Sequence, residues 1–130
     1  MSGSYNSGGE GAPIDSIEHM AAHLATGCKP KDAWRIGTEH EKFGFALKDH
    51  SPIPYDGEGP TVLKMLQGLT RFGWEEVRED GKTIALKRDG ASVSLEPGGQ
   101  FELSGAPLET LHQTCSEVNG HLKEVRTVAD

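Results

Sequence analysis

Cysteine, basic residues and long apolar runs are all scarce in this 130-residue chain. Two cysteines are too few for the disulfide framework of a small secreted protein. Thirteen Lys and Arg against 20 Asp and Glu give a net charge of −7. Because binding to the phosphates of a nucleic acid needs a basic surface, this charge argues against nucleic-acid binding. No apolar run approaches the roughly 20 residues of a membrane-spanning helix. We therefore expect a protein that has neither nucleic acid nor membrane as a partner.

Glycine, by contrast, is abundant, with 17 residues in the chain. Residues 1–13, MSGSYNSGGEGAP, are rich in Gly and Ser and nearly free of apolar side chains. This composition predicts a flexible arm, followed by a folded region at residues 14–130. The arm has neither the apolar segment of a signal peptide nor the arginines of a transit peptide. On that composition we expect a cytoplasmic protein.

Three segments have the apolar spacing of amphipathic helices, namely residues 14–27, 62–72 and 107–130. In the third segment Cys115 falls on the apolar stripe, which predicts a buried and unreactive thiol. The apolar spacing of this segment continues to Asp130 with no Gly, Asn or Pro to end the helix. We therefore expect the sequence to be part of a longer protein that continues beyond Asp130.

The rest of the chain has the composition of antiparallel strands. Residues 34–47 are rich in aromatic and β-branched residues and predict one strand. Residues 74–104 predict a meander, because Asp80-Gly81 and Asp89-Gly90 are typical two-residue hairpin turns and Pro97-Gly98-Gly99 a longer one. The sequence thus predicts an α+β fold, an antiparallel sheet with flanking helices.

The turn lengths also predict which side chains share a face of the meander. A two-residue turn at 89–90 places Leu86 opposite Val93, and a three-residue turn at 97–99 places Leu95 opposite Phe101. The predicted apolar face carries Ile84, Leu86, Val93, Leu95, Phe101 and Leu103. The predicted polar face carries Thr83, Ala85, Ser92, Ser94, Glu96, Gln100 and Glu102.

Two pairs of glutamates could bind a metal ion. Glu39 and Glu41 are two apart on a predicted strand and so point to the same side, while Glu96 and Glu102 share the polar face of the meander. Like charges so placed repel unless a cation joins them, and hard divalent cations prefer oxygen ligands. With no Cys/His ligand set, Mg²⁺ or Mn²⁺ is favoured over zinc. The residues alone leave open the alternative of solvated glutamates on a strand and at a hairpin tip.

Two longer strings are more specific than these pairs. Residues 35–45, RIGTEHEKFGF, and residues 94–109, SLEPGGQFELSGAPLE, resemble the two signatures of the glutamate–cysteine ligases of plants and many proteobacteria. The second resemblance continues through residues 111–115, LHQTC. This resemblance implies that the sheet is part of a glutamine synthetase-like catalytic domain.

The resemblance also implies an activity. That family joins the γ-carboxylate of glutamate to the amine of cysteine in an ATP-dependent reaction, through a γ-glutamyl phosphate, as the first step of glutathione biosynthesis. The implied partners are ATP, glutamate and cysteine, with Mg²⁺ as the cofactor. Members of the family are much longer than this chain, so we expect the isolated chain to be inactive. The alternatives are another carboxylate–amine ligase of the same fold, and a non-catalytic module that binds a divalent cation or a partner protein.

The resemblance assigns roles to seven positions of this sequence. The implied Mg²⁺ ligands are Glu39, Glu41, Glu96 and Glu102. Ser94 and Gln100 are implied to line the substrate and nucleotide pocket. Cys115 matches a cysteine that, in part of the family, forms a regulatory disulfide with a distant downstream cysteine, which makes it a candidate redox residue.

Overall fold

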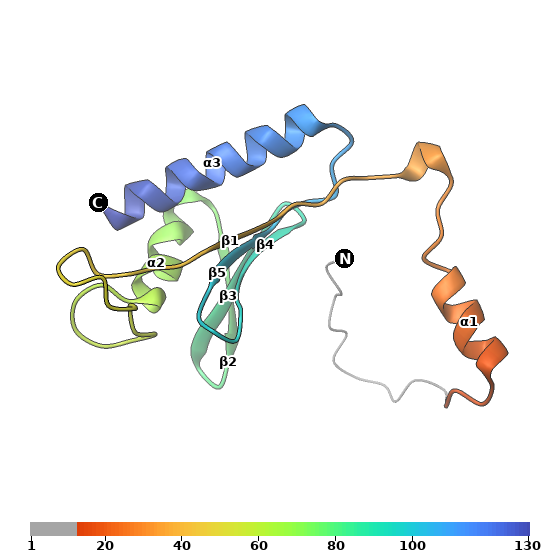
Figure 1. Cartoon of the computed structure of the whole chain (residues 1–130), viewed down its shortest axis with the longest axis horizontal. Helices are drawn as coiled ribbons and strands as arrows, with labels where there is room; N and C mark the ends of the chain where they lie inside the picture. Colours follow the sequence, from red (N-terminus) through yellow and green to blue (C-terminus); the bar gives the residue numbers. More distant parts are fainter. Residues whose placement is uncertain (1–12) are drawn as a thin grey trace.

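The computed structural model describes residues 13–130, which form a five-stranded antiparallel sheet with helices (Figure 1). The strands are β1 (Glu39–Lys42), β2 (Glu75–Glu79), β3 (Lys82–Arg88), β4 (Ala91–Leu95) and β5 (Phe101–Ser104). The helices are α1 (Ile17–Ala25), α2 (Val62–Leu69) and α3 (Leu111–Ala129), with 3₁₀ turns η1 (Lys31–Ala33) and η2 (Thr70–Phe72). The α+β prediction is confirmed. Of the predicted flexible arm, all but Pro13 lies outside the described residues.

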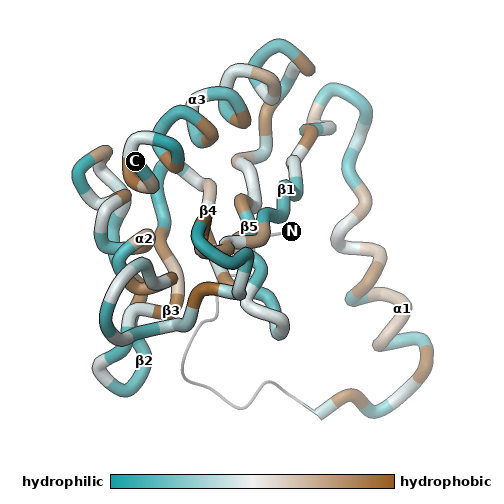
Figure 2. Tube along the Cα trace, turned by 60° about the vertical axis from the view of Figure 1, so that its left-hand side comes forward, coloured by the Kyte–Doolittle hydropathy of each residue, from teal (hydrophilic) through white to brown (hydrophobic). Residues whose placement is uncertain are grey.

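The sheet has the strand order β1-β5-β4-β3-β2. Helices α2 and α3 lie on one side of it, and α1 lies apart from the sheet (Figures 1 and 2). No α1 residue is buried, and its apolar side chains are exposed. Among residues 13–130, no helix combines the length and apolarity needed to cross a bilayer.

Both predicted two-residue turns are present. Asp80 and Asp89 each have a φ of 48°, and the glycines that follow them have φ values of 78° and 84°. Positive φ at both central positions is the geometry of the tight hairpin turn that matches strand twist. The turn at 89–90 fixes the predicted pairing of Leu86 with Val93, and the turn after Glu96 fixes that of Leu95 with Phe101.

The predicted alternation is wrong at the start of β3. Val77 lies opposite Ala85 but Arg78 lies opposite Thr83, so Ile84 has no partner on β2. Such a bulge shifts the alternation of faces by one residue. Thr83, predicted on the polar face, is therefore 2% exposed, while Ile84, predicted on the apolar face, is 37% exposed.

The strand predicted over residues 34–47 is regular only at Glu39–Lys42. Its one neighbour, β5, is four residues long, so it can offer only four partners. Beyond β1 the pairing reduces to single bridges, one between Ile36 and Leu108 and one between Phe45 and Pro52.

The core lies between α2, α3 and the covered face of the sheet. Its fully buried leucines are Leu66 and Leu69 of α2, Leu86 of β3 and Leu103 of β5. Thr61 caps α2 by accepting a hydrogen bond from the Lys64 backbone N–H. Gly73 ends the following η2 turn with a φ of 87°, a conformation that favours glycine.

Helix α3 packs on the core with only the C-terminal part of its predicted apolar stripe, where Val118, Val125 and Val128 lie against the buried cluster. It begins at Leu111, after a capping box between Thr110 and Gln113, rather than at residue 107. His121 is the residue of α3 that is most buried, whereas Leu111 and Cys115 are exposed. The predicted burial of Cys115 is wrong, because the turns that carry it lie beyond the end that packs on α2 (Figure 1).

The contact between α2 and α3 depends on a glycine. A Cβ at Gly68 would collide with the side chain of Val128. We expect Gly68→Ala to lower the free energy of unfolding by about 1–3 kcal/mol, because overpacking outweighs the better helix propensity of alanine. In the control Gly120→Ala, the new Cβ meets no atom within 4 Å, so stability should rise by roughly 0.5–1 kcal/mol. Urea unfolding of both variants measures their free energies of unfolding. Equal stabilisation of the two variants would contradict the close contact between Gly68 and Val128.

Candidate functional site

The register of three strands brings the predicted polar residues together. In β1, Glu41 lies opposite Glu102 of β5, which in turn lies opposite Ser94 of β4. Glu39 lies opposite Ser104. Because Leu103 and its neighbours on β4 and β3 face the core, these polar side chains point to the other side of the sheet. We call this side the acidic face.

Glu96 and Gln100 extend the acidic face at the turn between β4 and β5. The Glu96 N–H donates to the Gln100 carbonyl at 3.0 Å, and the Gly99 N–H donates to the Glu96 carbonyl at 2.8 Å. The Gln100 side-chain oxygen is buried and has no hydrogen-bond partner among the described residues. A Cβ at Gly98 would contact that oxygen, so glycine leaves room for it.

The other three glutamates act on the carboxyl group of Glu96. The pKa of Glu96 is raised above its usual value, first by a hydrogen bond with Glu102 and then by the charge of Glu102. Desolvation and the charges of Glu41 and Glu39 raise it further. Ser104 holds Glu102 in place, since its hydroxyl donates to Glu102 Oε1 at 3.0 Å. The structure therefore places Glu41 opposite Glu102 and puts Glu39 and Glu96 on the same side of the sheet, where the charges of the other three act on Glu96.

The donor set of the acidic face has the chemistry that Mg²⁺ prefers. Carboxylates and the unpartnered amide oxygen of Gln100 are hard oxygen ligands. As the side chains lie, however, no three His, Cys, Asp or Glu within residues 13–130 converge closely enough to hold a metal ion. The acidic face thus carries oxygen atoms of the kind that Mg²⁺ binds, but their present positions do not form a coordination shell.

The opposite side of β1 carries two basic residues that the sequence analysis did not single out. The Lys42 ammonium donates to the His40 carbonyl at 2.8 Å and lies 3.0 Å from His40 Nδ1. Burial lowers the pKa of Lys42 to about 8, an effect that the charge of Glu102 partly offsets. The alternation of acidic and basic residues in the segment EHEK indicates this arrangement, because successive residues of a strand point to opposite sides of the sheet.

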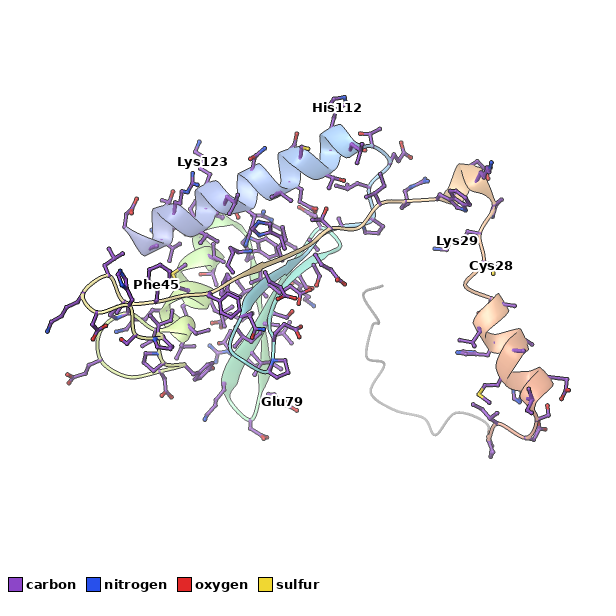
Figure 3. All side chains as sticks on the ribbon, in the orientation of Figure 1. Cys28, Lys29, Phe45, Glu79, His112 and Lys123 are labelled. Carbon is purple, nitrogen blue, oxygen red and sulfur yellow. The ribbon has the colours of Figure 1, made fainter. Side chains whose placement is uncertain are left out.

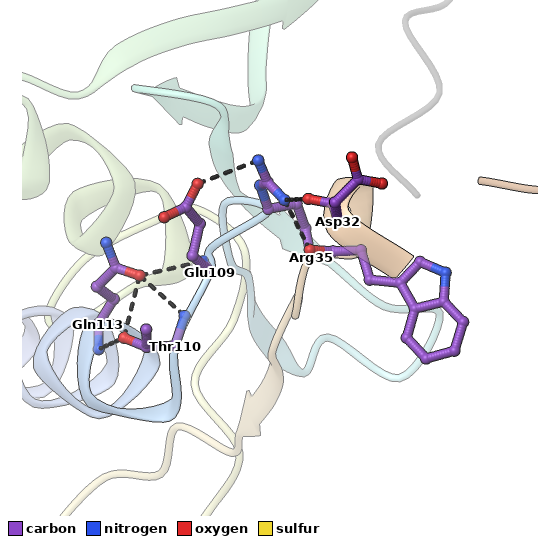
Figure 4. Close-up of polar contacts among 6 residues, drawn as sticks. Asp32, Arg35, Glu109, Thr110 and Gln113 are labelled. Atoms are coloured by element: carbon purple, nitrogen blue, oxygen red, sulfur yellow. Dashed lines mark hydrogen bonds and ion pairs between the residues drawn. The ribbon is translucent and has the colours of Figure 1, made fainter. Parts of the chain in front are cut away.

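A polar contact ties the segment before β1 to the one before α3 (Figure 4). Arg35 Nη2 lies 3.1 Å from Glu109 Oε1, and Arg35 Nη1 donates to the Trp34 carbonyl at 2.8 Å. Two backbone hydrogen bonds between Ile36 and Leu108, at 2.7 and 2.9 Å, reinforce the connection. This pairing holds β1 beside β5, and so holds Glu39 and Glu41 beside Glu102.

The two cysteines lie in different parts of the chain, and both are free and exposed. Cys28 follows α1, well away from the sheet (Figure 3). Cys115 lies on the solvent side of α3. The candidate redox role of Cys115 stays a prediction.

Comparison with known proteins identifies the class to which this arrangement belongs. Residues 35–130 match the model of Glutamate-cysteine ligase family 2 (GCS2). The chain is 58% identical over 114 residues to a chloroplastic glutamate–cysteine ligase of Arabidopsis thaliana, and 56% identical over the same length to chloroplastic glutamate–cysteine ligase A of Oryza sativa subsp. japonica. The chain therefore belongs to the glutamate–cysteine ligase family, which confirms the resemblance of its two signature strings.

The matched region is a small part of each relative. The 114 residues are 87% of this chain but 21% of the Arabidopsis protein and 22% of the rice protein. The comparison also overturns one expectation. A cytoplasmic location was inferred from the composition of residues 1–13, but these relatives are chloroplastic enzymes, so that inference is wrong.

Proposed function

We propose that this chain supplies one wall of the active site of an ATP-dependent glutamate–cysteine ligase, with the acidic face as its Mg²⁺-binding surface. The observation that carries the proposal is the strand register, which places Glu39 and Glu41 of β1 on the same side of the sheet as Glu102 of β5, with Glu96 at the adjoining turn. Family membership supports the reaction class. ATP, glutamate and cysteine are the proposed substrates, and the rest of a longer ligase chain is the proposed partner of this wall.

In the proposed reaction a γ-carboxylate oxygen of glutamate attacks the terminal phosphorus of ATP, and ADP leaves. The amine of cysteine then attacks the acyl carbon, phosphate leaves, and the amine proton is lost to solvent. Bound Mg²⁺ would offset the charge on the transferring phosphoryl group.

Within this chain, the proposed role of Glu39, Glu41, Glu96 and Glu102 is to hold the metal. The hydrogen bond from Ser104 orients Glu102 for that role. Ser94 lies beside Glu102, and Gln100 lies opposite Glu96, so both could line the substrate and nucleotide pocket.

The metal site is tested first on the chain itself. We expect Glu41→Gln to weaken the binding of Mn²⁺ to the chain by at least about tenfold, because one charged oxygen ligand is lost. Electron paramagnetic resonance of Mn²⁺ measures the affinity. Glu79→Gln is the matched control, since it removes an equal charge from an exposed position at the far end of β2 (Figure 3). Equal affinities for the two variants would contradict the assignment.

The reaction is tested in a complete enzyme. This chain would replace the matching segment of the Arabidopsis ligase, and phosphate release from ATP would be followed with glutamate and cysteine. We expect cysteine-dependent release, abolished by Glu41→Ala. Release with another amine but not cysteine would favour a different ligase of the same fold. Mn²⁺ binding without turnover in the chimera would favour a non-catalytic cation-binding module.

A further inference from the structure

Strand β1 has a partner on one edge of its backbone only. In the strand order β1-β5-β4-β3-β2 it is the outermost strand, with β5 as its neighbour. Figure 2 shows β1 on the outer side of β5, with α1 standing apart from both. Within residues 13–130, no strand pairs with the edge of β1 that faces away from β5. Backbone donors and acceptors on that edge therefore lack partners in the sheet.

The backbone hydrogen bonds show which groups point to the unpaired edge. The Thr38 carbonyl accepts a hydrogen bond from the Gly105 N–H at 2.6 Å, on the β5 side. His40 lies two residues further along the same register. In an antiparallel pair, residues that bond to the partner strand alternate with residues that do not. His40 therefore also bonds to β5, whereas Glu39 and Glu41 direct their backbone N–H and C=O groups to the unpaired edge.

The unpaired edge continues beyond the end of β1. The Gly44 carbonyl and the Ala46 N–H bond to residues 51–53, at 3.3 and 2.8 Å. Both lie an even number of positions from His40, so in an extended segment these bonds lie on the same edge as β5. Phe45, between them, directs its backbone groups to the other edge. We call this other edge of residues 39–45 the free edge.

Exposed aromatic side chains accompany the free edge. Phe43 is 69% exposed and Phe45, labelled in Figure 3, is 52% exposed. Trp34 and Leu47, on either side of residues 39–45, are 61% and 89% exposed. Large apolar side chains exposed together on one surface mark an interaction site. Unpaired backbone groups and exposed apolar side chains thus occur together on one segment.

The other edge of the sheet is built differently. Four of the five residues of β2, EEVRE, are charged, and the strand has a bulge between Val77 and Arg78. Charges and bulges are devices by which sheet edges avoid pairing with a further strand. β1 is charged as well, but its register with β5 is continuous, and the free edge runs on into Phe43 and Phe45. The free edge is therefore the better place for an added strand.

We propose that an extended segment of the longer ligase chain pairs as a further strand with the free edge of residues 39–45. This inference rests on the proposed function, which makes the rest of a ligase chain the partner of this wall. About four-fifths of each relative lies outside the matched 21–22%, so there is ample chain to supply a strand. Backbone hydrogen bonds would hold the added strand, and its apolar side chains would pack on Phe43 and Phe45.

An added strand would also act on the acidic face. It would hold the backbone of Glu39 and Glu41 from both edges, and would place its own side chains about 5 Å from theirs. Within residues 13–130, no three acidic, His or Cys side chains converge closely enough to hold a metal ion. Side chains of the added strand that point to the acidic face are therefore placed to contribute further ligands.

The test is amide hydrogen exchange, resolved to single residues by fragmentation in the mass spectrometer. It compares the 130-residue chain with the chimera in which this chain replaces the matching segment of the Arabidopsis ligase. We expect the amides of Glu39 and Glu41 to exchange at least about a hundredfold more slowly in the chimera, because they become bonded to the added strand. The His40 amide, which bonds to β5, is the internal control and should exchange more slowly than its neighbours in the isolated chain.

Three results would overturn the inference. One is unchanged exchange of the Glu39 and Glu41 amides in the chimera. Another is new protection along the outer edge of β2 in their place. The third is protection of the two amides in the isolated chain that increases with its concentration, which would show a second copy at the free edge. If the chimera does not fold, the same amides are measured at the aligned positions of the unaltered Arabidopsis ligase.

A pair of matched variants tests the contact with the added strand. In the chimera, Phe43→Lys should speed the exchange of the Glu41 amide at least about tenfold, because lysine resists pairing at a sheet edge. Leu47→Lys, the same kind of change at a more exposed position outside residues 39–45, should leave that rate unchanged. Equal rates in the two variants would contradict the packing of the added strand on Phe43.

Hydrogen exchange does not depend on turnover, so this inference and the proposed function can fail separately. Protection of both amides without cysteine-dependent phosphate release would count against the proposed function alone. Phosphate release without protection would overturn the added strand alone.

Discussion

Leu66→Ala is expected to lower the free energy of unfolding by about 2–5 kcal/mol, the range for removing a buried leucine side chain from a close-packed core. Leu66 is fully buried on α2, where it belongs to the cluster formed with β3, β4 and β5. Helix α2 is short, so its position on the sheet depends on such contacts rather than on intrinsic helix propensity. Urea unfolding followed by circular dichroism measures the change.

The matched control for this prediction is Leu47→Ala. Leu47 is 89% exposed in the loop after β1, so the same atoms are removed without leaving a cavity. We expect its effect to stay within about 0.5 kcal/mol. A comparable loss of stability in the two variants would mean that the core does not have the described packing.

The second large effect is a pH dependence of stability caused by His121. Its pKa is about 4 in the folded chain against 6.5 for an unperturbed histidine. Between these values the unfolded chain binds more protons than the folded one, so stability rises with pH. The contribution of His121 is therefore fully present above about pH 6.5 and is lost as the pH falls toward 4, by up to about 3 kcal/mol.

Several groups around His121 contribute to this behaviour. Burial is the largest cause of the lowered pKa, followed by the charge of Lys42 on β1. His40 and Arg88 act in the same direction, whereas Glu124 opposes them. Because these charges come from β1, β3 and α3, the pKa of His121 reports on the assembled core.

The measurement compares urea unfolding at pH 7 and pH 4. Because carboxylates also titrate in this range, we compare His121→Phe with the unaltered chain and expect a smaller loss of stability in the variant. His112→Phe is the matched control, since His112 is exposed on the same helix (Figure 3). If the loss between pH 7 and pH 4 is as large in His121→Phe as in the control, the burial of a neutral imidazole at this position is contradicted.

The chemistry of short turns made much of the sheet predictable. The pairs Asp80-Gly81 and Asp89-Gly90 adopt the positive φ values that hairpin turns require, and they fix the end of β2, both ends of β3 and the start of β4. The turn after β4 fixes the position of Glu102 opposite Ser94. These features depend on neighbours in the chain, so they could be worked out from local residues alone.

Two features of the candidate site could not be predicted in that way. Glu39 and Glu41 approach Glu102 only because β1 pairs with β5, about 60 residues later in the sequence. The Arg35–Glu109 ion pair and the Ile36–Leu108 bridge that support this pairing join residues that are even further apart in the sequence. The signature strings indicated that the glutamates belong to one site, but neither string contains the information that the two strands are adjacent.

The sequence by itself determined the hairpin turns, the register of β3, β4 and β5, and the family to which the chain belongs. Only the tertiary structure decided that Thr83 is buried instead of Ile84, and that α3 turns His121 inward and leaves Cys115 exposed. The physical reason is that residue types and their spacing indicate only a preference for burial. Which side chains are in fact buried, including the polar Thr83 and His121, depends on the bulge in β3 and on how much of α3 the sheet and α2 cover.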